Sequence, residues 1–152
     1  MRLQSLLYAT LNPPMRALLR SPLHGVASHN LAILDYTGRK SGRSYSTPLS
    51  FVREGSIVRF LSSHNTGWWK NFKDGPTPVE IEIARKTVRG VARLWDSDCD
   101  ELRNGVRRFL TALPRDAVIY GIGLDADRKP LESDIEKRAS HVVLVEVEVE
   151  VD

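Results

Sequence analysis

The amino-acid sequence predicts a mainly β or α+β fold, in which about six antiparallel strands form a small barrel with helices packed outside it. Compact or alternating apolar runs, typical of strands, recur from residue 31 onward. Two-residue turn signals such as Glu54-Gly55 join neighbouring runs, which favours hairpins. Apolar residues at helical spacing occur at the start of the chain and between the last two expected strands.

Each expected strand has its own signal. Residues 79–83 alternate between apolar and acidic side chains, as a half-buried strand does. The last strand shows the same alternation, and Gly90 marks a bend or bulge in the longest one. The expected strands cover residues 31–37, 47–53, 56–63, 79–83, 87–95 and 141–151.

Four helical regions are expected. Residues 1–28 form an N-terminal helical segment with apolar stripes, interrupted at Asn12-Pro13-Pro14. A longer helix begins after Ser97, which we expect to cap it, and buries one apolar stripe. Shorter helices follow at residues 114–120 and 131–139. With 152 residues and no long linker, we expect a single domain spanning residues 1–152.

Composition narrows the class of protein. The net charge of +3 and the pI near 9.2 fit a small anionic ligand better than nucleic acid, because the sequence has no long basic tract. A lone cysteine, Cys99, indicates a reducing compartment. No apolar run reaches the ~18 residues of a membrane helix, so we expect a cytoplasmic protein without stable membrane insertion. The histidines lack ligand spacing, and no metal site is expected.

The stretch Thr37–Pro48 is the clearest candidate binding element. It combines glycines, cations and hydroxyls between two apolar runs, a composition that suits a phosphate group. Ile33 stands where a Walker motif needs glycine, so the stretch is not a P-loop. Arg39 could bind phosphate in a bidentate way, Lys40 as a point charge, and Ser41 and Thr47 through hydroxyls. The alternative is a solvated basic hairpin loop.

Two further segments accompany this loop. Ser62 and Ser63 end the third expected strand, where a ligand can lie at a barrel mouth, although taken alone a polar turn explains them better. In the expected helical turn that follows, Trp68 and Trp69 point about 100° apart, so that one ring can enter the core while the other lines a cavity. The alternative is that both tryptophans belong to the core.

No catalytic residue follows from the sequence. It contains neither a nucleophile elbow nor a Cys–His signature. Tyr120, near the end of a late helix, could donate a proton, but a core tyrosine is the simpler explanation. If the protein is an enzyme, a cofactor would supply the reactivity.

These segments, in this order, closely resemble the deazaflavin-dependent nitroreductase family of the flavin-binding split-barrel superfamily, which includes pyridoxamine-phosphate oxidase-like proteins. The resemblance spans about residues 30–96 and rests on their spacing together, since Gly-Arg-Lys-Ser-Gly alone is a weak signal. The segments that carry it are Thr37–Gly42, Thr47-Pro48, the Arg53–Gly55 hairpin, Ser62-Ser63 and Trp68–Phe72.

The resemblance implies a six-stranded split β-barrel that binds coenzyme F420, a deazaflavin carrying hydride at a ring carbon. Arg39, Lys40 and Ser41 would then hold the cofactor's phosphate and acidic tail. Tyr45 and His64 stand where some family members carry cations, which leaves FMN as an alternative cofactor. The remaining site residues implied by the resemblance are Thr47 and Pro48 in the pocket, Ser62 and Ser63 beside the ring or phosphate, and Trp68, Trp69 and Asn71 in the wall.

Three functions are therefore open. The leading hypothesis is a reductase that passes hydride from reduced F420 to a small electron-poor acceptor, such as a nitro compound or a quinone. The second is an FMN-binding split-barrel protein. The third is a nucleic-acid-binding barrel, against which the scattered acidic residues count. The resemblance also implies a possible homodimer.

Overall fold

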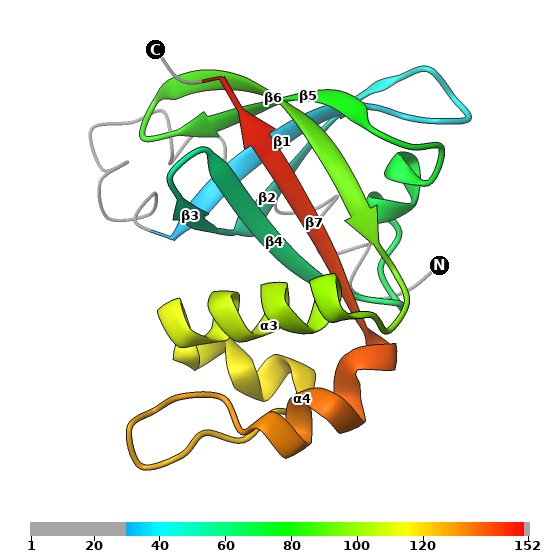
Figure 1. Ribbon diagram of the computed structural model, residues 1–152. Helices are drawn as coiled ribbons and strands as arrows, with labels where there is room; N and C mark the ends of the chain where they lie inside the picture. The colour runs from blue at the N-terminus through cyan, green and yellow to red at the C-terminus, as the bar shows by residue number, and fades with distance from the viewer. Residues whose placement is uncertain (1–29, 151–152) are drawn as a thin grey trace.

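The computed structural model describes residues 30–150, and the N-terminal segment 1–28 lies outside them. One curled antiparallel sheet carries a layer of helices across one face (Figure 1). The elements in chain order are β1 (Leu31–Thr37), β2 (Ser44–Ser50), β3 (Val52–Glu54), β4 (Ile57–Ser63), η1 (Trp68–Phe72), β5 (Thr77–Ile83), β6 (Lys86–Trp95), α3 (Asp100–Ala112), η2 (Pro114–Tyr120), α4 (Glu132–Arg138), η3 (Ala139–His141) and β7 (Val142–Val149).

The sheet has seven strands in the order β2-β1-β5-β6-β7-β4-β3, whereas six were expected. The difference arises at Phe51, which separates β2 from β3. β2 pairs with β1 at one edge of the sheet and β3 pairs with β4 at the other. A single residue therefore joins the two edges, so the sheet curls toward closure as a split barrel does.

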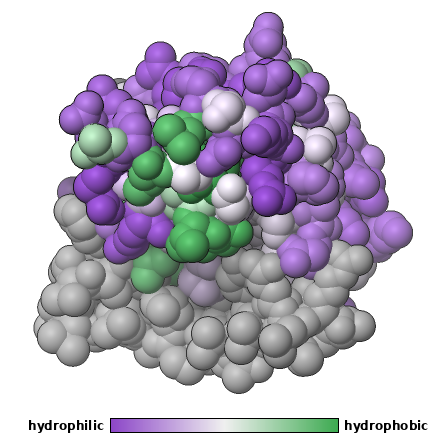
Figure 2. Space-filling view, turned by 90° about the horizontal axis from the view of Figure 1, so that it is seen from below, coloured by the Kyte–Doolittle hydropathy of each residue, from purple (hydrophilic) through white to green (hydrophobic). Residues whose placement is uncertain are grey.

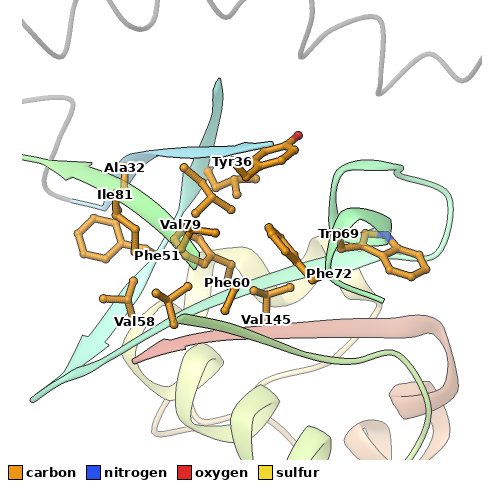
Figure 3. Packing of buried hydrophobic residues seen from close by; sticks show 14 of the residues in the cluster. Ala32, Tyr36, Phe51, Val58, Phe60, Trp69, Phe72, Val79, Ile81 and Val145 are labelled. Carbon is orange, nitrogen blue, oxygen red and sulfur yellow. The ribbon is translucent and has the colours of Figure 1, made fainter. Parts of the chain in front are cut away.

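The barrel interior is one of two hydrophobic clusters. It includes Leu34, Phe60, Phe72, Ile81 and Val145, which come from four strands and from η1 (Figure 3). Alternate residues of each strand point to the same side of a sheet, and the expected strands supply these residues at that period. The barrel core therefore extends from the strands to η1, which follows β4.

The second cluster lies between the sheet and the helices. The stripe expected on α3 is buried there, as Leu102, Val106, Phe109 and Leu110 show. β7 has one face in each cluster, because Leu144 packs under α3 while its neighbours Val143 and Val145 enter the barrel. The expectation that Ser97 caps α3 is wrong: Cys99 occupies the N-cap position, without a side-chain hydrogen bond.

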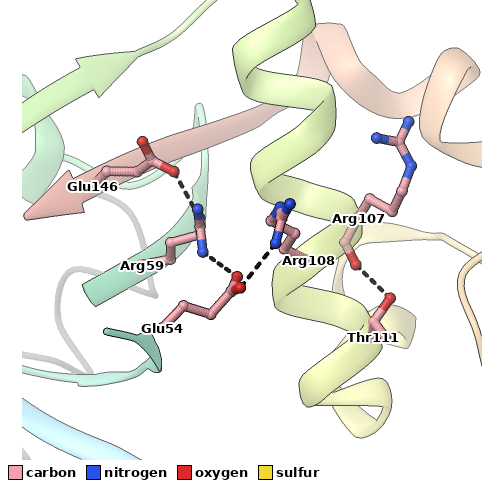
Figure 4. A network of polar contacts seen from close by, with 6 residues as sticks. All are labelled: Glu54, Arg59, Arg107, Arg108, Thr111 and Glu146. Carbon is pink, nitrogen blue, oxygen red and sulfur yellow. Dashed lines mark hydrogen bonds and ion pairs between the residues drawn. The ribbon is translucent and has the colours of Figure 1, made fainter. Parts of the chain in front are cut away.

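A buried cation connects the sheet to α3. The guanidinium of Arg59 on β4 donates to Glu146 on β7 at 2.6 Å and to Glu54 on β3 at 2.5 Å (Figure 4). Arg108 of α3 donates to the same Glu54 at 2.8 Å. The four side chains thus connect three strands to the helical layer, and their charges are balanced across it.

The helical side also exposes apolar side chains. Seen from this side, a hydrophobic patch interrupts an otherwise polar surface (Figure 2). Val118 and Ile119 of η2 are 81% and 63% exposed, the highest fractions among the large hydrophobic residues described. No helix in the described residues is long and apolar enough to cross a membrane.

Candidate functional site

The loop between β1 and β2 is closed by its own backbone. The N–H of Gly38 donates to the carbonyl of Arg43 at 2.7 Å, and the N–H of Gly42 donates to the carbonyl of Gly38 at 3.0 Å. Gly42 has φ +69°, which favours glycine. At Gly38 a Cβ would lie 2.6 Å from both the Tyr45 ring and the Ser41 hydroxyl, so any larger residue would have to displace these side chains. Both glycines thus shape the loop.

The loop docks against η1, far away in the sequence. The backbone N–H of Arg39 donates to the Asn71 side-chain oxygen at 2.8 Å, across 32 positions of the chain. The Asn71 amide in turn donates to the carbonyl of Trp68 at 2.9 Å. The Arg39 guanidinium also reaches Asp74 at 3.3 Å. The structure therefore brings the basic loop and the tryptophan segment together.

The three residues that the resemblance assigns to the phosphate and acidic tail are each placed differently. The guanidinium of Arg39 is engaged by Asp74. Lys40 is exposed at the tip of the loop. The Ser41 hydroxyl lies 3.2 Å from the Tyr45 hydroxyl and accepts the N–H of Arg43 at 3.2 Å. Unlike the guanidinium of Arg39, the ammonium group of Lys40 therefore faces solvent and forms no ion pair with a described residue.

Thr47 and Pro48 are buried neighbours on β2, and they point to opposite sides of the strand. The Thr47 hydroxyl lies 3.1 Å from that of Tyr36 on β1. Burial raises the pKa of the Tyr36 hydroxyl, which keeps it protonated at neutral pH. The Tyr36 ring stacks on Tyr45 at 5.7 Å and meets Phe72 edge-on at 5.6 Å. An aromatic layer therefore lies beneath the loop.

The end of β4 is held by the two tryptophans. The Trp68 indole donates to the Ser62 hydroxyl at 3.2 Å, and the Trp69 indole donates to the Ser63 carbonyl at 3.1 Å. Ser62 also contacts the Thr66 hydroxyl at 2.5 Å. Each polar group at this strand end thus has a partner within the turn, which the polar-turn alternative also anticipates.

Both tryptophans are buried, with 6% of Trp68 and 2% of Trp69 exposed. Their rings contribute to the barrel core, as the core alternative expected. The ammonium groups of Lys70 and Lys73 lie 5.8 Å and 5.4 Å from the centre of the Trp69 ring, at distances that allow cation–π attraction. The role of the two tryptophans in a cofactor wall stays a prediction.

Several residues of this region escaped the sequence analysis. Tyr36 gave no signal, because its apolar surroundings mark it simply as part of a strand. Lys73 follows Trp69 by four positions, a helical spacing that could have indicated their contact, whereas Lys70, one position after Trp69, gives no such signal. Tyr120, considered as a proton donor, packs against the helical cluster rather than against the loop. The structure therefore separates Tyr120 from the residues expected to bind the cofactor.

The residues around the loop fit a flat, phosphate-bearing group. The cations Lys40, Arg43, Lys70 and Lys73 form no ion pair with any residue in the described part of the chain. Tyr45 leaves 42% of its surface exposed beside them. An anionic heterocycle can bind such a region, because the cations can contact its anionic group and the aromatic surface can contact its ring. Within residues 30–150, no cluster of three or more potential ligands could hold a metal.

Comparison with solved structures identifies the architecture. A chain described as a domain-swapped dimer aligns with a TM-score of 0.58 at 20% identity, over 91% of this chain and 96% of that one. An F420-H2-dependent reductase, FDR-A, aligns at 0.52 and 19%, over 80% and 95%. A protein from Listeria innocua, described provisionally as a pyridoxamine 5'-phosphate oxidase, aligns at 0.52 and 12%, over 93% and 94%. At these identities the likeness shows the fold, which is that of the split-barrel proteins.

Sequence comparison identifies the family. A protein of Mycobacterium tuberculosis (strain ATCC 25618 / H37Rv), named provisionally as an F420H(2)-dependent quinone reductase, is 30% identical over 81 residues, which cover 45% of this chain and 68% of the relative. The model of the F420H(2)-dependent quinone reductase family matches residues 20–115, which include the whole basic loop and η1. Together with the fold, this match makes the chain a member of the F420H(2)-dependent quinone reductase family, and hence an enzyme whose cofactor is F420.

Proposed function

We propose that the protein transfers hydride from reduced F420 to a small electron-poor acceptor, with quinones as the first class to test and nitro compounds as the second. Family membership supports a quinone acceptor. The structural observation that carries the proposal is the hydrogen bond from Arg39 to Asn71, which docks the basic loop on η1. One continuous surface then offers cations, amide groups and aromatic rings to the same ligand.

In this proposal the loop binds the anionic end of the cofactor. Lys40 contacts phosphate directly, and Arg39 and Ser41 shape the loop around it. Lys70, which the structure adds to the site, lies over Trp69 and extends the positive surface toward the acidic tail. Because Lys40 and Lys70 form no ion pair with a described residue, an anion can bind them without first breaking an ion pair.

The remaining residues form the wall of the proposed site. They hold the ring of the cofactor in one orientation and keep water away from it. Bound F420 supplies the hydride, so the protein's own contribution is to place two flat molecules at reacting distance. Solvent completes the proton delivery, because Tyr120 packs with the other cluster. The wall consists of Thr47, Pro48, Ser62, Ser63, Trp68, Trp69 and Asn71.

Substitution of Lys40 tests the proposal. We expect Lys40→Ala to weaken F420 binding about tenfold, since one charge-assisted contact to phosphate is lost. Lys86→Ala, an equally charged and exposed position on β6, is the matched control. Titration monitored by tryptophan fluorescence gives the dissociation constants, and recovery of the oxidised cofactor's violet absorbance gives the rate of quinone reduction. Equal affinity in the Lys40 variant and the wild type would exclude the loop as the phosphate site.

The other expectations are tested with the same protein. The absorption spectrum of what co-purifies distinguishes the deazaflavin, which the family match supports, from FMN. A flat salt titration on an oligonucleotide would remove the nucleic-acid alternative. Light scattering tests the homodimer, for which the likeness to a domain-swapped dimer gives support. We also propose the single domain and the cytoplasmic location, as predicted from the sequence.

A further inference from the structure

A cavity opens beside η1. It has a volume of about 430 Å³ and lies between the segment that follows η1 and the end of β6. β6 ends next to η1, as Figure 1 shows. Phe72 and Lys73 line the cavity from one segment, and Arg93, Trp95 and Asp96 line it from the other. None of these five residues belongs to the predicted cofactor-binding set.

The cavity borders the proposed cofactor site. Asn71, which receives the N–H of Arg39, directly precedes two lining residues of the cavity, Phe72 and Lys73. Asp74, which pairs with the Arg39 guanidinium, follows them. The segment 71–74 therefore anchors the basic loop and forms one wall of the cavity. A molecule in this cavity would lie next to a cofactor held by the loop and η1.

The lining suits a flat molecule that becomes negatively charged. Half-buried Trp95 supplies aromatic surface, whereas Phe72 is 1% exposed and belongs to the barrel core. Lys73 and Arg93 supply two cations, and neither forms an ion pair with another residue of the described chain. Asp96 is the single acidic residue of the lining. Because neither cation is paired with a carboxylate, both can stabilise negative charge as it develops on the oxygen of a bound ligand.

We propose that this cavity binds the electron acceptor and that Arg93 and Lys73 contact the oxygens of a quinone there. The inference rests on the proposed function. Transfer of one hydride, which is two electrons and a proton, converts the quinone to a hydroquinone monoanion and leaves the cofactor oxidised. The two cations stabilise the oxygen that gains the negative charge. One further proton from solvent completes the hydroquinone.

Substitution of Arg93 tests the proposal more directly than substitution of Lys73, because Lys73 also lies over Trp69. We expect Arg93→Gln to lower kcat/KM for menadione, a soluble naphthoquinone, by about tenfold or more. Its dissociation constant for F420 should stay within about twofold of the wild type. Arg89→Gln is the matched control, since Arg89 is exposed on the same strand and lies outside this cavity. Binding of menadione without cofactor, followed by tryptophan fluorescence, gives a readout independent of turnover.

The outcomes separate this inference from the proposed function. Loss of kcat/KM and of menadione binding in the Arg93 variant, with the Arg89 control unaffected, supports the cavity. Unchanged kcat/KM in both the Arg93 and Lys73 variants overturns it, while the proposed function stands. If the wild type reduces neither quinones nor nitro compounds, the proposed function fails. In that case menadione binding decides: binding that Arg93→Gln abolishes supports the cavity, and binding that it leaves unchanged, or no binding, overturns it.

Discussion

Asn71 is the position where one substitution tests the docking of the basic loop on η1. Its side chain makes two hydrogen bonds, accepting from Arg39 at 2.8 Å and donating to the Trp68 carbonyl at 2.9 Å. Asn71→Leu keeps the size of the side chain and removes both. At roughly 1 kcal/mol for each bond, the ordered loop loses about 2 kcal/mol. Because F420 binding must then restore that order, its dissociation constant should rise about thirtyfold.

The measurement is a fluorescence titration with F420, accompanied by thermal unfolding monitored by circular dichroism. Asn71→Asp is informative because it keeps the acceptor for Arg39 but sets a carboxylate against the Trp68 carbonyl, so we expect intermediate affinity. Asn104→Leu is the control, since Asn104 is exposed on α3 in the helical layer. If Asn71→Leu binds F420 as tightly as the wild type and is equally well folded, the docked loop is not the cofactor anchor.

Two predictions concern the stability of the fold. Arg59→Met should lower the free energy of unfolding by about 3 kcal/mol in urea titrations, because it removes the cation that Glu146 and Glu54 share. A loss below about 1 kcal/mol would contradict this role. Burial raises the pKa of Asp116 despite the neighbouring Arg115, so the folded state favours the protonated carboxyl. Asp116→Asn should therefore be more stable than the wild type at pH 7, and the difference should shrink as the pH falls through about 4; a gain independent of pH would refute the reasoning.

Most of the fold could be predicted because its signals are local. The strand periods, the turn at Glu54-Gly55 and the stripe on α3 each lie within a few residues of one another, and the structure confirms all three. The strand expected at 47–53 is different. It divides at Phe51 because its first part pairs with β1 and its second part with β4, and such distant pairing leaves no mark in the segment itself.

The candidate site could be predicted in its parts but not in its connections. Glycine, cations and hydroxyls marked the basic loop, and the tryptophan pair marked η1. The contact between them depends on Asn71 and Arg39, which are 32 positions apart, and neither residue type predicts the other. Tyr36 lies under the loop because the register of β1 and β2 sets it opposite Tyr45. That register becomes visible only when the sheet is assembled.

The segment from Asn71 to Asp74 lies between the proposed binding sites for the cofactor and the acceptor. A hydride passes only between two rings in contact, so the binding sites for donor and acceptor must share a wall. In this fold η1 leads straight into the loop before β5. In the segment they share, Asn71 and Asp74 contact Arg39 of the basic loop, whereas Phe72 and Lys73 line the cavity beside β6. The hydrogen bond that docks the basic loop therefore also orders the segment 71–74, which both the cofactor and the acceptor would contact. In the proposed function, an anchor that does not contact the reacting atoms would in this way set the distance across which hydride moves.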